Sequence, residues 1–141
     1  MKKNDSVHCE TDFRFHVNLA YMNLDIMAIT HVYFHLVRGD SSYISEYGTV
    51  EVNGKKYFLD RNVKLFFSER ERNGYHEVRR DGVDKNPQDN VPDEIYEAMS
   101  SRQKLLYFRV SDFGDDFWQI SDLRRTIVIC KKKENTTHFM Y

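Results

Sequence analysis

The sequence predicts an α+β fold: a single domain with a mainly antiparallel sheet of about 6–7 strands and one principal helix, residues 92–104, packed on one face. Three observations predict it. Several segments alternate apolar and polar residues, two Asn-Gly pairs separate such segments, and a Pro-Asp-Glu run marks a helix start. A chain of 141 residues suits one domain, 1–141, in which we expect residues 1–11 and 134–141 to be flexible.

Composition limits the class of protein. The chain holds ten Phe, nine Tyr and one Trp, and disordered chains lack aromatic residues at this level. Its 21 basic and 22 acidic side chains give a net charge of −1, which argues against a globally basic nucleic-acid binder and against an acidic DNA mimic. We therefore expect a globular domain with a real hydrophobic core.

The first half of the chain contains the clearest strand pattern and the least certain segment. Residues 12–21 alternate strictly, with Phe13, Phe15 and Val17 on one face, and this predicts a strand. Residues 23–38 fit either a strand, favoured over 30–37 by β-branched residues, or a helix with a partial apolar stripe; a short helical turn over 24–28 is also compatible.

Two hairpins and a loop follow. Asn53-Gly54 and Asn73-Gly74 each lie between strand-like segments, and both central residues of such a turn need positive φ. Residues 81–91 are polar and contain glycine and proline, so we expect an exposed loop there.

The last third contains the predicted helix. Pro92, Asp93 and Glu94 favour a helix start, and Ile95 and Met99 would face the core. The sequence pattern predicts strands over 105–110 and 125–131, and an acidic loop over 111–118 between them.

Cysteine usage and the absence of long apolar stretches predict a cytoplasmic location. Cys9 and Cys130 are too few for a disulfide framework and are expected to be reduced thiols. No signal-peptide core and no membrane-spanning stretch is recognisable, so we expect a soluble protein with no membrane partner.

The sequence offers no motif for a metal, a cofactor or a catalytic group. His31 and His35 share one face of a helix or of a strand, but on a strand they lie about 13 Å apart, too far for one ion. Zinc-protease, EF-hand, phosphate-loop and nucleophile-elbow patterns are absent. We expect no cofactor, no metal and no catalytic residue.

Basic and aromatic residues gather in the last third, where residues 102–133 hold eight basic and four acidic side chains. Arginine matches phosphate geometry and aromatic faces stack on bases, so this segment predicts a site for a nucleotide or an acidic partner. The alternative is a solvated sheet face with cross-strand ion pairs. The candidate ligand-binding residues are Tyr107, Arg109, Trp118, Arg124, Arg125, Arg79 and Arg80.

We expect a non-enzymatic binding or inhibitor protein, for example a phage or mobile-element factor that blocks a host defence protein or sequesters a nucleotide signal. Its partner would be a host protein or a phosphate-bearing small ligand. Two alternatives remain open: a small metal-independent nuclease or phosphodiesterase using His16, His31, His35 or His76 with arginines, and a structural subunit that forms a homo-oligomer or larger assembly.

Overall fold

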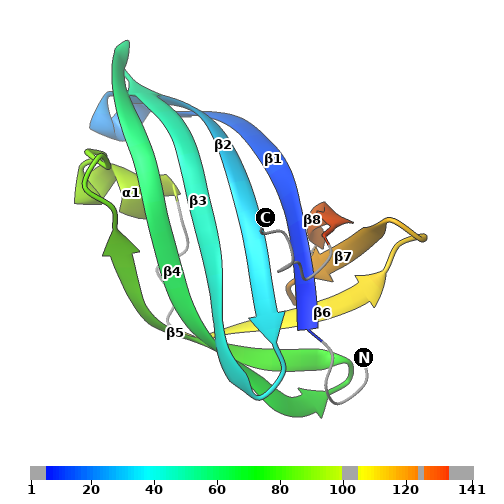
Figure 1. The fold of residues 1–141 in the computed structure, drawn as a ribbon. Helices are drawn as coiled ribbons and strands as arrows, with labels where there is room; N and C mark the ends of the chain where they lie inside the picture. The colour runs from blue at the N-terminus through cyan, green and yellow to red at the C-terminus, as the bar shows by residue number, and fades with distance from the viewer. Residues whose placement is uncertain (1–5, 100–104, 124–125, 134–141) are drawn as a thin grey trace, which may run out of the picture.

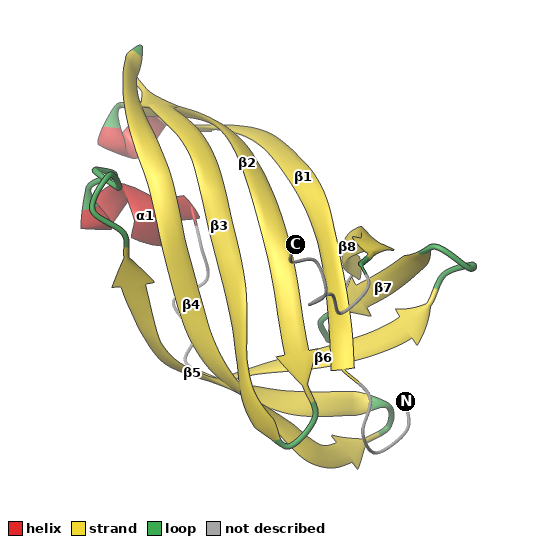
Figure 2. Cartoon of the chain, in the orientation of Figure 1, coloured by secondary structure: helices red, strands yellow, loops and turns green. Residues whose placement is uncertain are grey.

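A computed structural model describes residues 6–99, 105–123 and 126–133 of the chain. Eight antiparallel strands form a closed barrel in which each strand pairs with the next and the last returns to the first (Figures 1 and 2). The strands are β1 (Ser6–Leu19), β2 (Leu24–Val37), β3 (Asp40–Val52), β4 (Lys55–Arg72), β5 (Tyr75–Lys85), β6 (Leu105–Asp112), β7 (Phe117–Ser121) and β8 (Thr126–Lys132). A short 3-10 turn, η1 (Ala20–Met22), joins β1 to β2, and one helix, α1 (Asp93–Met99), joins β5 to β6.

The predicted α+β sheet with a principal helix over 92–104 is wrong. The described helix spans only Asp93–Met99, and residues 100–104 lie outside the described part of the chain. Eight consecutive antiparallel strands bury their apolar face by closing on one another, and a barrel of this size leaves an interior that side chains fill. The closed sheet therefore does not need a long helix to cover it.

The two predicted hairpin turns are confirmed, and the strand predicted over 12–21 is confirmed as far as Leu19, after which η1 begins. Asn53 and Asn73 have φ of 51° and 54°, each followed by a glycine with positive φ, as the hairpin turns require. The ambiguous segment 23–38 forms strand β2, and the helical turn lies earlier, at η1.

Two stretches that the sequence places at the periphery belong to the barrel. Residues 6–11, expected in a flexible terminus, form the start of β1, where Val7 and Cys9 are fully buried. The loop expected over 81–91 is only partly a loop, because β5 continues to Lys85. Its later part is not exposed throughout, since Val91 is buried.

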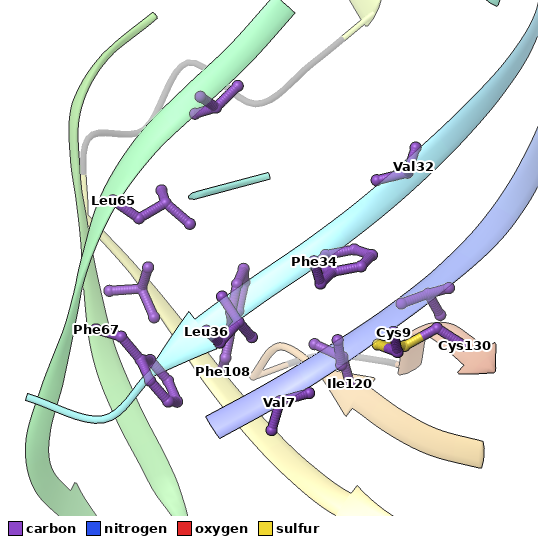
Figure 3. Close-up of a cluster of buried hydrophobic side chains, with 13 residues drawn as sticks. Val7, Cys9, Val32, Phe34, Leu36, Leu65, Phe67, Phe108, Ile120 and Cys130 are labelled. Atoms are coloured by element: carbon purple, nitrogen blue, oxygen red, sulfur yellow. A yellow bond between two sulfur atoms is a disulfide. The ribbon is translucent and has the colours of Figure 1, made fainter. Parts of the chain in front are cut away.

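The interior contains two apolar clusters, one toward each end of the barrel. At one end, side chains such as Leu36, Phe67 and Ile120 pack together (Figure 3). At the other end, Ile95 and Tyr96 of α1 pack against inward-facing residues of β2, β3 and β4. The helix therefore fills the end of the barrel that β6–β8 do not cover.

Buried charges lie beside the α1 cluster. Arg61, which is 3% exposed, donates from Nε and Nη2 to the carboxylate of Asp89 at 2.8 and 3.1 Å and from Nη2 to the Val91 carbonyl at 2.8 Å. Glu46 is the cross-strand partner of Arg61 and accepts a 2.5 Å hydrogen bond from the Tyr96 hydroxyl. Burial raises the pKa of Glu46 above its ordinary value, while the hydrogen bond from Tyr96 and nearby arginines oppose that rise.

The closure between β1 and β8 is short and is crossed by a disulfide. Within the described residues, β8 pairs with β1 only at Cys9–Lys132 and Glu10–Lys131. Cys9 and Cys130 form a disulfide beside this closure, with Cα atoms 5.4 Å apart (Figure 3). The expectation of two reduced thiols is therefore wrong: the cysteines lie 121 positions apart along the chain, and only barrel closure brings them together.

Candidate functional site on the outer face of β1 to β4

The alternation along β1 and β2 sorts side chains between the interior and the outer face. Even-numbered residues of β2, such as Phe34 and Leu36, point inward and are buried. Odd-numbered residues of β2 and even-numbered residues of β1 therefore share the outer face, and the register places His8 directly opposite His35.

Two histidines and two tyrosines form a compact group on this outer face, which we call the histidine–tyrosine cluster. The Nδ1 atoms of His8 and His35 lie 3.1 Å apart, and the Tyr33 hydroxyl lies 3.0 Å from Nδ1 of His8. The His35 ring stacks on the Tyr43 ring, with centroids 4.7 Å apart. On the other side of the His8 ring, Nε2 lies 3.0 Å from the Ser6 hydroxyl.

The electrostatics of the cluster favour uncharged imidazoles. Burial lowers the pKa of His8, and the neighbouring His35 lowers it further. Burial also lowers the pKa of His35. Both rings are therefore in the neutral form, which has a free lone pair, at neutral pH.

A third histidine on the same face, His31, has a raised pKa, in contrast to His8 and His35. His31 lies between two carboxylates of β1, with Nδ1 2.8 Å from Asp12 and Nε2 2.9 Å from Glu10. The hydrogen bond to Asp12 is the largest cause that raises the pKa of His31; burial opposes it, and Glu10 adds to it.

This arrangement predicts a pH-dependent contribution to stability. Because the pKa of His31 is raised above its ordinary 6.5, its contribution is fully present below that value and is lost as pH rises through the folded-state pKa. We expect His31→Gln to lower the free energy of unfolding by about 0.5–1 kcal/mol near pH 6 and by less near pH 9, since solvent screens this half-exposed group. Urea unfolding at both pH values measures the difference; an equal loss at both would contradict it.

Next to these histidines, the outer face carries exposed apolar side chains on three adjacent strands. Met27 and Ile29 of β2, Tyr47 of β3 and Phe58 of β4 are 49%, 50%, 61% and 53% exposed. The register connects them, because Thr49 of β3 pairs with Ile29 on one side and with Phe58 on the other. We call Met27, Ile29, Tyr47 and Phe58 the outer patch.

The structure divides the predicted basic–aromatic residues between the two faces of the sheet. Tyr107, Arg109 and Arg79 lie on the outer face of β5 and β6, where the Arg109 guanidinium lies 4.7 Å from the Tyr75 ring centroid. The Arg79 side chain forms an ion pair with Asp81 at 3.1 Å.

The remaining predicted residues lie elsewhere. Arg80 faces the interior, where its charge acts on Glu46 and Tyr96. Trp118 packs against the apolar cluster with Lys132 Nζ 4.6 Å from its ring centroid. Arg124 and Arg125 lie outside the described residues. The described members of the predicted set therefore do not form one surface.

The histidines proposed for nuclease chemistry are likewise separated. His76 lies in the interior, with Nδ1 2.9 Å from the Ser68 carbonyl oxygen and its ring against Phe67. The Nε2 atom of His16 lies 2.6 Å from Oδ1 of Asp25, a hydrogen-bond distance, on the outer face. His31 and His35 are on the outer face too, so His76 cannot act together with them.

The fold and its outer face define a small closed antiparallel barrel that is capped by a helix and presents histidines and apolar side chains to solvent. By comparison with known families, the chain belongs to the FidL-like putative membrane protein family, whose model matches residues 48–130, more than half of the chain. The matched region runs from β3 to Cys130 and leaves out β1 and β2. No curated protein and no solved structure matches the chain.

Within the ranges 6–99, 105–123 and 126–133, no helix has the length and apolar character needed to cross a membrane.

Proposed function

We propose that this chain is a non-enzymatic binding domain whose outer patch docks on a second copy of the same chain. The observation that carries the proposal is the exposure of Met27, Ile29, Tyr47 and Phe58, all between 49% and 61%, on three adjacent strands. Single exposed apolar residues are ordinary, but contiguous ones mark interaction surfaces. Aromatic residues and methionine are also enriched in protein interfaces.

Charge complementarity supports a second copy as the occupant. Lys56 and Asp60 lie two residues before and after Phe58, on the same outer face of β4. A two-fold axis that crosses the strands at Ile29, Thr49 and Phe58 places Lys56 of one copy against Asp60 of the other, twice. The same axis pairs Phe58 with Phe58 at the centre, where fully desolvated aromatic residues contribute most to binding.

The disulfide supports an oxidising compartment as the place of action, in preference to the cytoplasm that the sequence predicts, because cytosolic thiols are kept reduced. The arrangement of the described arginines does not support a nucleotide signal or a host defence protein as the ligand. The described arginines of the predicted anion site lie on different faces of the sheet.

Replacing the central aromatic residue by a charge is expected to separate the copies. Phe58→Glu buries two carboxylates at the axis, and loss of a central aromatic residue costs about 2 kcal/mol or more, so the dimer dissociation constant rises by on the order of 30-fold. Sedimentation velocity over a range of protein concentrations measures this shift. Stability of the fold is expected to change little, because Phe58 is outside the core.

A matched control uses an equally exposed phenylalanine elsewhere. Phe113, in the β6–β7 loop, is 52% exposed, and Phe113→Glu is expected to dimerise as the unmodified chain does. A chain that stays monomeric at high concentration overturns the proposal. So does a monomer that floats with phospholipid vesicles through Phe58, since the occupant would then be a lipid surface.

A further inference from the structure

The histidine–tyrosine cluster has dimensions that fit a metal ion. A zinc–imidazole bond is about 2.0–2.1 Å long, so two nitrogens on one ion lie about 2.9 Å apart at a right angle and about 3.3 Å apart at a tetrahedral angle. The Nδ1 atoms of His8 and His35 lie 3.1 Å apart, between these two spans. The spacing of the two nitrogens therefore fits one ion, which would replace the N–H···N hydrogen bond that now joins the two rings.

The rings are also oriented for this role. When His8 donates its Nε2 proton to the Ser6 hydroxyl, 3.0 Å away, its Nδ1 lone pair points toward His35. Metal-binding histidines characteristically donate their other N–H to such an outer partner, which fixes the ring and its tautomer. Stacking against Tyr43 holds the His35 ring, and the Tyr33 hydroxyl adds an oxygen 3.0 Å from His8 Nδ1.

The scaffold keeps the two rings together. His8 and His35 are direct partners in the β1–β2 ladder, which continues without a shift from Ser6–Val37 to Leu19–Leu24. Sites built on paired strands hold their geometry better than sites built on loops.

We propose that His8 and His35 form a two-histidine site for a divalent first-row transition metal, with water completing the coordination. Among the described residues, no group of three or more His, Cys, Asp or Glu side chains is placed to hold one ion, so the protein supplies two imidazole ligands and leaves the other positions to water. Two imidazole ligands without carboxylates favour Cu²⁺ over Zn²⁺ and exclude Ca²⁺ and Mg²⁺ as preferred ions. This site is independent of the proposed dimer.

The test is isothermal titration calorimetry of the intact, disulfide-bonded chain, with Cu²⁺ alone and with Zn²⁺ alone. We expect one saturable site per chain, with Cu²⁺ bound more tightly than Zn²⁺. His35→Gln and His8→Gln each remove a ligand and are expected to weaken binding at least about tenfold, since loss of an outer partner alone costs that much. The electron paramagnetic resonance spectrum of the Cu²⁺ complex should show two nitrogen donors in the unmodified chain and one in each of these variants.

Two histidines on the same two strands provide matched controls. His16→Gln on β1 and His31→Gln on β2 keep the pair intact and are expected to bind both ions as the unmodified chain does. His35 is less buried than His8, so His35→Gln keeps the test valid if His8→Gln does not fold. The inference is overturned if neither ion saturates a single site, or if the control variants lose as much affinity as His35→Gln.

Discussion

Reducing the Cys9–Cys130 disulfide is expected to lower the free energy of unfolding by about 4–5 kcal/mol, close to the whole stability of many domains. The reason is chain entropy in the unfolded state. The disulfide closes a loop of 121 residues, and a cross-link of that length removes many unfolded conformations.

The position of the disulfide adds a local effect. Within the described residues, β8 pairs with β1 only at Cys9–Lys132 and Glu10–Lys131. Just beyond β8, the Lys133 N–H donates to the His8 carbonyl oxygen at 2.8 Å, and the Lys133 side chain forms an ion pair with Glu10 at 3.1 Å. Without the covalent link, these few contacts must hold the barrel closed. We therefore expect the amides of β8 to lose hydrogen-exchange protection before those of β2 and β3, each of which is paired along its whole length with a neighbouring strand, β1 or β4.

Chemical denaturation with and without a phosphine reductant measures the effect. The matched control is the double variant Cys9→Ala/Cys130→Ala, whose unfolding should be the same with and without reductant. If the unmodified chain unfolds at the same denaturant concentration in both conditions, the disulfide does not stabilise the barrel and the expectation fails.

A feature of the fold could be predicted when a few neighbouring residues determine it, and could not when it depends on residues far apart in the sequence. Strand β1 and the turns at Asn53 and Asn73 were predictable, because alternation and positive φ are local properties of a few residues. Barrel closure was not, since it depends on the pairing of Cys9 with Lys132 across almost the whole chain. The same long-range pairing hid the disulfide.

The site was predictable only in part for a related reason. Alternation indicated that His31, Tyr33 and His35 share a face, but only the register brings His8 opposite His35. A basic–aromatic segment, by contrast, says nothing of which face each residue takes. Arg79 and Arg80 are neighbours in sequence and therefore point to opposite sides of β5.

The second large effect is expected at the buried ion pair beside α1. The Asp89 side chain is fully buried and accepts hydrogen bonds from Arg61 and from the backbone N–H groups of Asp60 and Val91. Burial raises the pKa of Asp89, but the hydrogen bonds from Arg61 and the two backbone groups outweigh it, so the pKa lies below its ordinary value. Its contribution to stability is therefore present at neutral pH and is lost only as pH falls through the lowered folded-state pKa.

Asp89→Asn is expected to lower the free energy of unfolding by about 3–5 kcal/mol, because it leaves the buried Arg61 guanidinium without its main counter-ion. The Asp60 and Val91 N–H groups bond to different oxygens of the Asp89 carboxylate, and asparagine keeps only one acceptor oxygen, so the loss includes one backbone hydrogen bond as well as the charge. Denaturant unfolding of Asp89→Asn and of the double variant Arg61→Met/Asp89→Asn separates the effect of the unpaired Arg61 charge from the effect of Arg61 packing. The double variant removes both charges and should be more stable than Asp89→Asn alone. The Arg61 guanidinium also lies over the Tyr96 ring, 4.2 Å from its centroid. If the double variant is instead less stable than Asp89→Asn, this packing holds α1 in the barrel and the ion pair does not.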